Sequence, residues 1–207
     1  MKNIFGLTKK EFALLKKLNT PIKIQNFLDR MPVNFEKGGE TNMSPKRALR
    51  ENKIHCFEGA LIAALALWIA GEEPLIMDMR AEHPDVDHVL ALYKRNGYWG
   101  AISKTNHATI RFRDPVYKTI RELALSYFHE WFLNTNGKKT LREYSKPYNL
   151  KKQGTDWITA EKDLWHLVDV LDDLPHFDIA PKKNYKFLRF ADPMEMKAGR
   201  LIEWKRT

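Results

Sequence analysis

The first part of the chain places its apolar residues at a helical spacing. Residues 8–31 carry them three or four positions apart, which predicts two amphipathic helices in succession. Thr8 and Thr20 are suited to cap the two helices, because a threonine hydroxyl can accept the free N–H groups of a first turn. Residues 33–43 hold few apolar residues and are expected to form an exposed loop, and a short helix is expected over 46–51.

The most apolar stretch of the chain follows directly. Residues 56–70 are apolar almost throughout, and Gly71 comes next, which predicts a buried central helix that ends there. The stretch is too short to cross a bilayer and contains Glu58, so a place in a protein core is expected. Cys56 stands at the polar end of this helix.

After the central helix the pattern changes to short runs typical of strands. Strands are expected over 74–80, 87–94 and 98–103, and the Asn-Gly pair at 96–97 predicts a tight hairpin turn between the last two. This order predicts an α+β fold, in which a cysteine-bearing central helix packs on a small antiparallel sheet of at least three strands and is flanked by helices.

The last part of the chain predicts further elements. A long helix is expected over 115–132 and another over 159–171, with a polar, irregular segment over 138–158 between them. Strands are expected over 185–190 and 200–204.

The length and composition suit one compact domain. The chain has 207 residues, of which 43% are hydrophobic, enough for a core with a helical appendage. We expect an N-terminal helical segment over 1–50, a core over 51–135, and a C-terminal helix and strand extension over 136–207.

The charge balance favours acidic partners without requiring one. Lysine and arginine number 35 against 26 acidic residues, a formal charge of +9. Nucleic acid is a conceivable partner but not the favoured one, because the basic residues are spread along the chain and form no block of five. No membrane partner is expected, and the sequence does not indicate the oligomeric state.

A single cysteine cannot form an internal disulfide, which favours a reducing compartment. The first residues contain no apolar signal core, so a cytoplasmic protein is expected.

Cys56 and His88 together indicate a chemical activity. A thiol in the first turn of a helix lies near unpaired N–H groups and the positive end of the helix dipole, which lower its pKa and can hold an oxyanion. A histidine at the head of a neighbouring strand could act as the base. The alternative is that Cys56 is simply a small buried apolar residue.

The segment 52–106 resembles the core of the transglutaminase-like, papain-related cysteine superfamily. In that family a helix opens with the nucleophilic cysteine, a histidine begins the next paired strand, and an aspartate lies late on the strand after it. The matching motifs are Cys56–Ala60, Asp87–Tyr93 and Asn96–Ser103.

The resemblance implies cysteine-dependent acyl transfer or amide hydrolysis on a peptide or amide substrate, with no cofactor. Cys56 would be the nucleophile and His88 the base. Where the family has its aspartate this chain has Ser103, so the group that orients the imidazole would be Asn106 or Ser103. Since the family includes members without catalysis, the alternative is an inactive binding protein on the same scaffold, which could contact nucleic acid through its basic surface.

Two further residues belong to this hypothesis. Asn52 is a candidate oxyanion donor, and its alternative is a helix or turn cap. Trp99 could cover the thiol, and its alternative is a packing role.

Two other polar clusters give weaker indications of a binding site. Residues 83–88 contain two histidines and two aspartates, but Asp85 and Asp87 would face one side of a strand and His88 the other, so no metal site is expected. His107, Arg111 and Arg113 could bind an acidic substrate; their alternative is a surface arm whose charges pair with Asp114 or Glu122.

Overall fold

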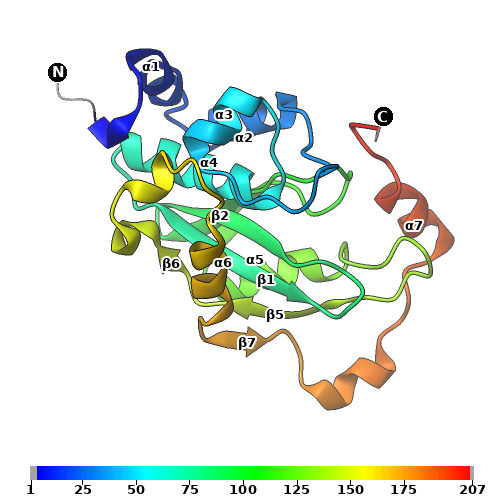
Figure 1. Ribbon diagram of the computed structural model, residues 1–207. Coiled ribbons are helices and arrows are strands. Elements are labelled where there is room, and N and C mark those ends of the chain that lie inside the picture. The colour runs from blue at the N-terminus through cyan, green and yellow to red at the C-terminus, as the bar shows by residue number, and fades with distance from the viewer. Residues whose placement is uncertain (1–3, 206–207) are drawn as a thin grey trace.

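The computed structural model describes residues 4–205 and contains a seven-stranded, antiparallel sheet flanked by helices (Figure 1). The strand order is β4-β3-β2-β1-β5-β7, and β6 pairs with β1 beyond the end of β5. The strands are β1 Leu75–Ala81, β2 His88–Arg95, β3 Tyr98–Ile102, β4 Arg113–Tyr117, β5 Leu141–Ser145, β6 Tyr148–Asn149 and β7 His176–Asp178. The α+β class predicted from the sequence is therefore confirmed, with a larger sheet.

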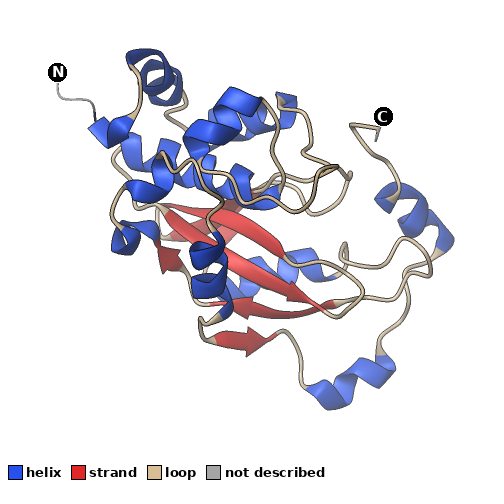
Figure 2. Ribbon diagram, viewed as in Figure 1, coloured by secondary structure: helices blue, strands red, loops and turns tan. Residues whose placement is uncertain are grey.

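The helices lie mainly at the two ends of the chain and on both faces of the sheet (Figure 2). They are α1 Lys9–Lys17, α2 Pro21–Arg30, α3 Pro45–Glu51, α4 Cys56–Ile69, α5 Ile120–Phe128, α6 Trp165–Asp172 and α7 Pro193–Gly199. Thr8 and Thr20 cap α1 and α2 through their hydroxyls, as predicted.

Two apolar layers hold the sheet between helices. On one face α4 packs against Ile76 and Ala91, together with α1, α2 and α6. On the other face α5 packs against Met77 and Leu90. Because neighbouring residues of a strand face opposite sides, these adjacent pairs serve different layers. Helix α4 is apolar on every side because it is covered all round, and most of its side chains are fully buried.

The hairpin between β2 and β3 fixes the register that the site depends on. Asn96 and Gly97 both have positive φ angles, 49° and 88°, the geometry of a two-residue turn that matches strand twist. The turn pairs Arg95 with Tyr98 and, further along, Ala91 with Ile102. This prediction is confirmed.

The long helix expected over 115–132 is wrong at its start and its end. Arg113–Tyr117 forms the edge strand β4, paired with β3, and the helix begins only at Ile120 behind its cap Thr119. Pro115 suits the first turn of a helix, but proline is equally suited to an edge strand, where no ladder N–H is needed on the open side.

The C-terminal predictions also need correction. Residues 138–158 are not irregular, since they contain β5 and β6. The helix expected from 159 begins at Trp165, because Asp163 and Leu164 are bonded to the loop at Asn42 instead. The strands expected over 185–190 and 200–204 are absent. A 3-10 helix covers 182–187, and residues 200–204, which follow α7, contain only an isolated bridge between Ile202 and His107.

Across residues 4–205 the structure contains no helix of sufficient length and apolar character to span a bilayer.

Candidate functional site

Cys56 is the first residue of α4 and is partly exposed. It lines a cavity of about 160 Å³ together with residues from the loop before β2 and the segment after β3. The lining is Val33, Ile54, His55, Cys56, Val86, Asp87, His88, Lys104, Thr105 and Asn106. Within the part of the chain that the structure describes, the backbone N–H of Cys56 donates to no other group. Cys56 therefore brings a partly exposed thiol to this cavity from the first turn of α4.

His88 reaches this cavity as the first residue of β2, and its orientation is fixed from β3. Its Nε2 lies 2.8 Å from Ser103 Oγ, and that hydroxyl donates to the Ile110 carbonyl at 2.6 Å. Because the hydroxyl proton is already used, Ser103 must accept from Nε2–H. The lone pair of the neutral ring is therefore on Nδ1, which leaves Nδ1 for proton transfer.

Ser103 is held rigidly from the other side. Its backbone N–H donates to the Gln25 side chain at 3.0 Å, and its carbonyl accepts from the same amide at 2.8 Å. Gln25 is a buried residue of α2, so the orienting hydroxyl is fixed by a side chain 78 positions earlier. The ring of Trp131 also packs against that of His88 at nearly a right angle, with ring centroids 5.9 Å apart.

Lys104 ties the end of β3 to two helices. Its side chain is buried, and Nζ donates to the carbonyls of Leu28 and Met31 at the C-terminal end of α2. Its Cβ lies so close to Gly59 of α4 that a Cβ on Gly59 would lie 2.6 Å from it. The glycine therefore allows the segment after β3 to approach the first turn of the cysteine helix.

The surroundings of the thiol favour its ionised form. Burial would raise the pKa of the Cys56 thiol, but the charge of His88 and the neighbouring His55 outweigh it and hold that pKa well below its usual value. A thiolate is the reactive nucleophile, so this environment activates the sulfur.

His55 is a residue of the site that the sequence analysis missed. It is the N-cap of α4, and its Nδ1 accepts from the Phe57 N–H at 3.1 Å. Its Nε2 lies 2.8 Å from the Thr41 carbonyl. The sequence feature that could have indicated His55 is its place directly before Cys56, at the start of the apolar helix. Histidine is not among the residues usually found at an N-cap, so the sequence does not predict this role.

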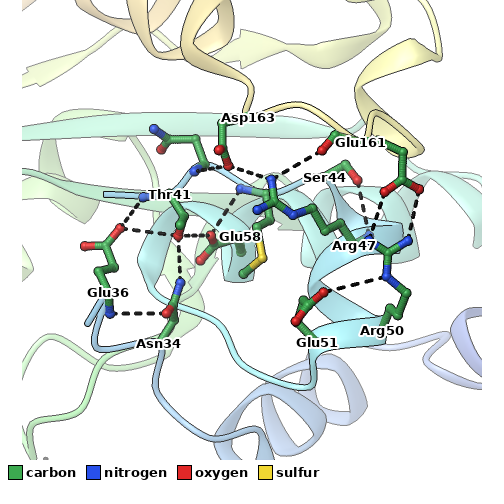
Figure 3. Close-up of polar contacts among 12 residues, drawn as sticks. Asn34, Glu36, Thr41, Ser44, Arg47, Arg50, Glu51, Glu58, Glu161 and Asp163 are labelled. Atoms are coloured by element: carbon green, nitrogen blue, oxygen red, sulfur yellow. Dashed lines mark hydrogen bonds and ion pairs between the residues drawn. The ribbon is translucent and has the colours of Figure 1, made fainter. Parts of the chain in front are cut away.

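A buried carboxylate supports this turn. Glu58 is fully buried in α4 and accepts from the backbone N–H groups of His55, at 2.7 Å, and Met43, at 3.2 Å. Figure 3 shows that Thr41 lies between Glu36 and Glu58. The bond to Glu36 lies within the loop before α3, and the bond to Glu58 joins that loop to the cysteine helix.

The same loop is anchored to the segment before α6. Asp163 accepts from the Asn42 N–H and from Arg47, each at 2.9 Å, and Arg50 forms a bidentate pair with Glu161 (Figure 3). The Cys56 turn is therefore braced by chain segments more than 100 positions apart in sequence.

The other predicted site residues lie elsewhere or have different contacts. Asn106 lines the cavity, but its side chain is bonded to the N–H and carbonyl of Trp204. Asn52 ends α3 in the left-handed conformation, with φ 51°, and is exposed. Trp99 packs in the layer on the α5 face, with Lys94 over its ring, rather than over the thiol.

The two further polar clusters have structural partners. Asp85 accepts from Thr140, and Asp87 accepts from the Ala81 N–H at 2.7 Å. Arg111 pairs with Glu203 and Arg113 with Glu130, not with Asp114 or Glu122. Among residues 4–205 no group of three or more histidine, cysteine or acidic side chains is arranged to hold a metal ion.

Comparison of the chain with models of known protein families found no match, and comparison with curated protein sequences found none either.

Proposed function

We propose that the protein catalyses cysteine-dependent acyl transfer or amide hydrolysis on a transglutaminase-like core. Cys56 is the nucleophile, and His88 is the general acid and base. The observation that carries the proposal is one cavity that holds both a partly exposed thiol at a helix N-terminus and an imidazole oriented by Ser103. This combination is what nucleophilic catalysis by cysteine requires.

The chemistry follows from the positions of these groups. The Cys56 thiolate attacks the carbonyl carbon of an amide, and the oxyanion forms beside the free N–H of Cys56 at the start of α4. The Nδ1 atom of His88, which has first taken up a proton from solvent, gives that proton to the leaving amine. The C–N bond breaks and a thioester remains. The Nδ1 atom then takes a proton from the water or amine that attacks the thioester, and the thiolate is released.

The substrate has room on both sides of His88. A second cavity, of about 150 Å³, shares the side chains of Val86, Asp87, His88 and Thr105 with the cavity of Cys56 and continues toward Trp131. A peptide or amide could therefore lie across the imidazole with its two parts in different hollows.

An activated ester tests the proposal without knowledge of the substrate. p-Nitrophenyl acetate should give an initial burst of p-nitrophenol and an acetylated Cys56 visible by mass spectrometry, followed by slow turnover. Cys56→Ser should remove the burst, and His88→Ala should reduce turnover at least about 10²-fold, the usual contribution of a general acid or base.

The inactive alternative gives a different result. If Cys56 is acetylated and alkylated no faster than an ordinary thiol, and His88→Ala changes neither rate, the catalytic proposal is wrong and a binding protein on this scaffold remains. Salt-sensitive retention on a heparin column would then indicate that its basic surface binds polyanions.

A further inference from the structure

The imidazole of His55 is fixed at both ring nitrogens. A carbonyl can only accept, so the Nε2 atom that faces the Thr41 carbonyl must carry a proton, and the Nδ1 atom that accepts from the Phe57 N–H holds the lone pair of the neutral ring. A proton that leaves the neighbouring thiol can therefore be received by His55 only at Nδ1.

Two carboxylates lie close enough to the His55 ring to stabilise a positive charge on it. Glu36 Oε1 lies 3.3 Å from Nε2 and Glu58 Oε2 lies 3.4 Å from Nδ1. Glu58 is fully buried, which raises the pKa of its carboxyl and leaves its charge, once ionised, poorly screened by water. His88 is bonded instead to a neutral hydroxyl, that of Ser103. Of the two imidazoles beside Cys56, His55 thus has the acidic partners.

We propose that His55 is a positioning residue that holds Cys56 as a thiolate before acylation and after release of the product, while His88 alone exchanges protons with the substrate. This inference rests on the proposed function. Under this proposal one histidine stabilises the thiolate and the other transfers protons, two roles that a single imidazole paired with a carboxylate would otherwise combine.

The proton inventory balances on this basis. In the resting site the S–H bond of Cys56 breaks and an N–H bond forms at Nδ1 of His55, with Glu58 in place of Phe57 as the partner of that nitrogen. His88 takes a proton from solvent, gives it to the leaving amine, and regains one from the attacking water or amine. The thiolate expelled at the end needs no proton, because the His55 imidazolium remains beside it.

Both rings contribute to the electrostatic surroundings of the thiol, since the charges of His88 and of His55 each lower the pKa of Cys56. Burial opposes a charge on His55, but Cys56, Glu58 and the Thr41 carbonyl together raise the pKa of its imidazole to about 10. The other charged or titratable groups that line the cavity are Asp87, His88 and Lys104. The ammonium of Lys104 donates to the carbonyls of Leu28, in α2, and Met31, just after it.

Alkylation by iodoacetamide across pH 4–10 measures the ionisation of Cys56 directly. In His55→Asn the asparagine can still cap α4, since asparagine is a preferred N-cap, but the charge is lost. We expect its alkylation midpoint to rise by at least about one pH unit, which corresponds to tenfold slower labelling near pH 6. His129→Asn, at an exposed histidine after α5, is the matched control and should leave the midpoint unchanged.

A measurement on the unaltered chain guards against a misfolded variant. Nitrogen NMR of the histidine rings should show His55 protonated at both nitrogens at pH 8, and Cys56→Ser should lower the pH at which this ring loses its second proton.

The outcomes separate the two proposals. An unchanged alkylation midpoint in His55→Asn, or a neutral His55 ring at pH 8, overturns the role of His55. The proposed function still stands in that case if His88→Ala abolishes turnover of p-nitrophenyl acetate. A Cys56 that titrates like an ordinary thiol in the unaltered protein overturns both.

Discussion

The Nε2 atom of His88 lies 2.8 Å from the hydroxyl of Ser103, the residue that follows β3. A hydroxyl can fix the plane and tautomer of the ring, but it cannot neutralise an imidazolium. In this protein the nearby carboxylates surround His55 instead. Orientation and charge compensation are therefore provided at two different histidines.

Ser103→Ala tests the orienting contact. The substitution removes the acceptor of His88 Nε2–H and the donor to the Ile110 carbonyl. We expect turnover of p-nitrophenyl acetate to fall about tenfold or more, because the ring loses its fixed position. The free energy of unfolding should fall by about 1–2 kcal/mol through the lost hydrogen bonds.

Ser126→Ala is the control for that variant, since the Ser126 hydroxyl also donates to a backbone carbonyl, at 2.6 Å, but in α5. It should cost similar stability and leave turnover unchanged. Equal turnover in both variants would show that the contact with Ser103 does not orient the base.

Gly59→Ala tests the close approach between α4 and the segment after β3. Alanine in place of glycine in a helix usually stabilises it by up to about 1 kcal/mol. Here the new Cβ would lie 2.6 Å from Lys104 Cβ, a position that side-chain rotation cannot relieve. We expect the free energy of unfolding in urea to fall by about 1–3 kcal/mol.

Gly38→Ala supplies the comparison, because a Cβ on Gly38 has no neighbour within 4 Å. It should leave the unfolding free energy nearly unchanged. If Gly59→Ala were as stable as the unaltered chain, the contact with Lys104 would not be a tight one.

Lys104→Met should change how stability depends on pH. Burial lowers the pKa of the Lys104 ammonium from 10.5 to about 8. Between these two values the unfolded chain binds a proton that the folded chain does not, so this group makes stability rise with pH. The gain in the free energy of unfolding from this group is complete above pH 10.5 and is lost as the pH falls through about 8.

The measurement is the difference in unfolding free energy between the unaltered chain and Lys104→Met, followed from pH 7 to 10.5. As the pH rises over this range, the unaltered chain should gain roughly 3 kcal/mol of unfolding free energy relative to Lys104→Met. Lys9→Met, at an exposed lysine of α1, is the matched control for removal of a lysine charge. A flat difference for Lys104→Met would contradict the depressed pKa.

Asp78→Asn tests a buried pair on the α4 face of the sheet. Asp78 Oδ2 lies 3.0 Å from His176 Nε2, and both side chains are about 5% exposed. Burial raises the pKa of the Asp78 carboxyl to about 6. The folded chain then binds more protons than the unfolded chain between pH 3.8 and 6, so this contribution is present below pH 3.8 and is lost as the pH rises through about 6.

Unfolding of the unaltered chain and of Asp78→Asn should be compared between pH 3.5 and 7. The unaltered chain should lose up to about 3 kcal/mol relative to the variant over that range. Asp173→Asn, at an exposed position after α6, is the matched control for removal of a carboxylate. A variant that tracks the unaltered chain at every pH would exclude a raised pKa at Asp78.

The sequence alone determined those helices and turns whose causes lie within a few neighbouring residues. Capping threonines, Pro21, the unbroken apolar stretch of α4 and the Asn-Gly turn each act within a few residues, so α1, α2, α4 and the β2–β3 hairpin were predicted close to their observed bounds. The turn also fixes which residues of β2 and β3 face each other, because strand register follows from turn geometry.

Only the tertiary structure decided the groups around the thiol. Asn106 is bonded to Trp204, 98 positions later, and Ser103 is held by Gln25, 78 positions earlier. Glu36 reaches the His55 ring from a loop on the far side of α3. Hydrogen bonds and ion pairs depend on distances of a few ångströms, and these are set by how helices and sheet pack, which the spacing of residues along a chain does not specify.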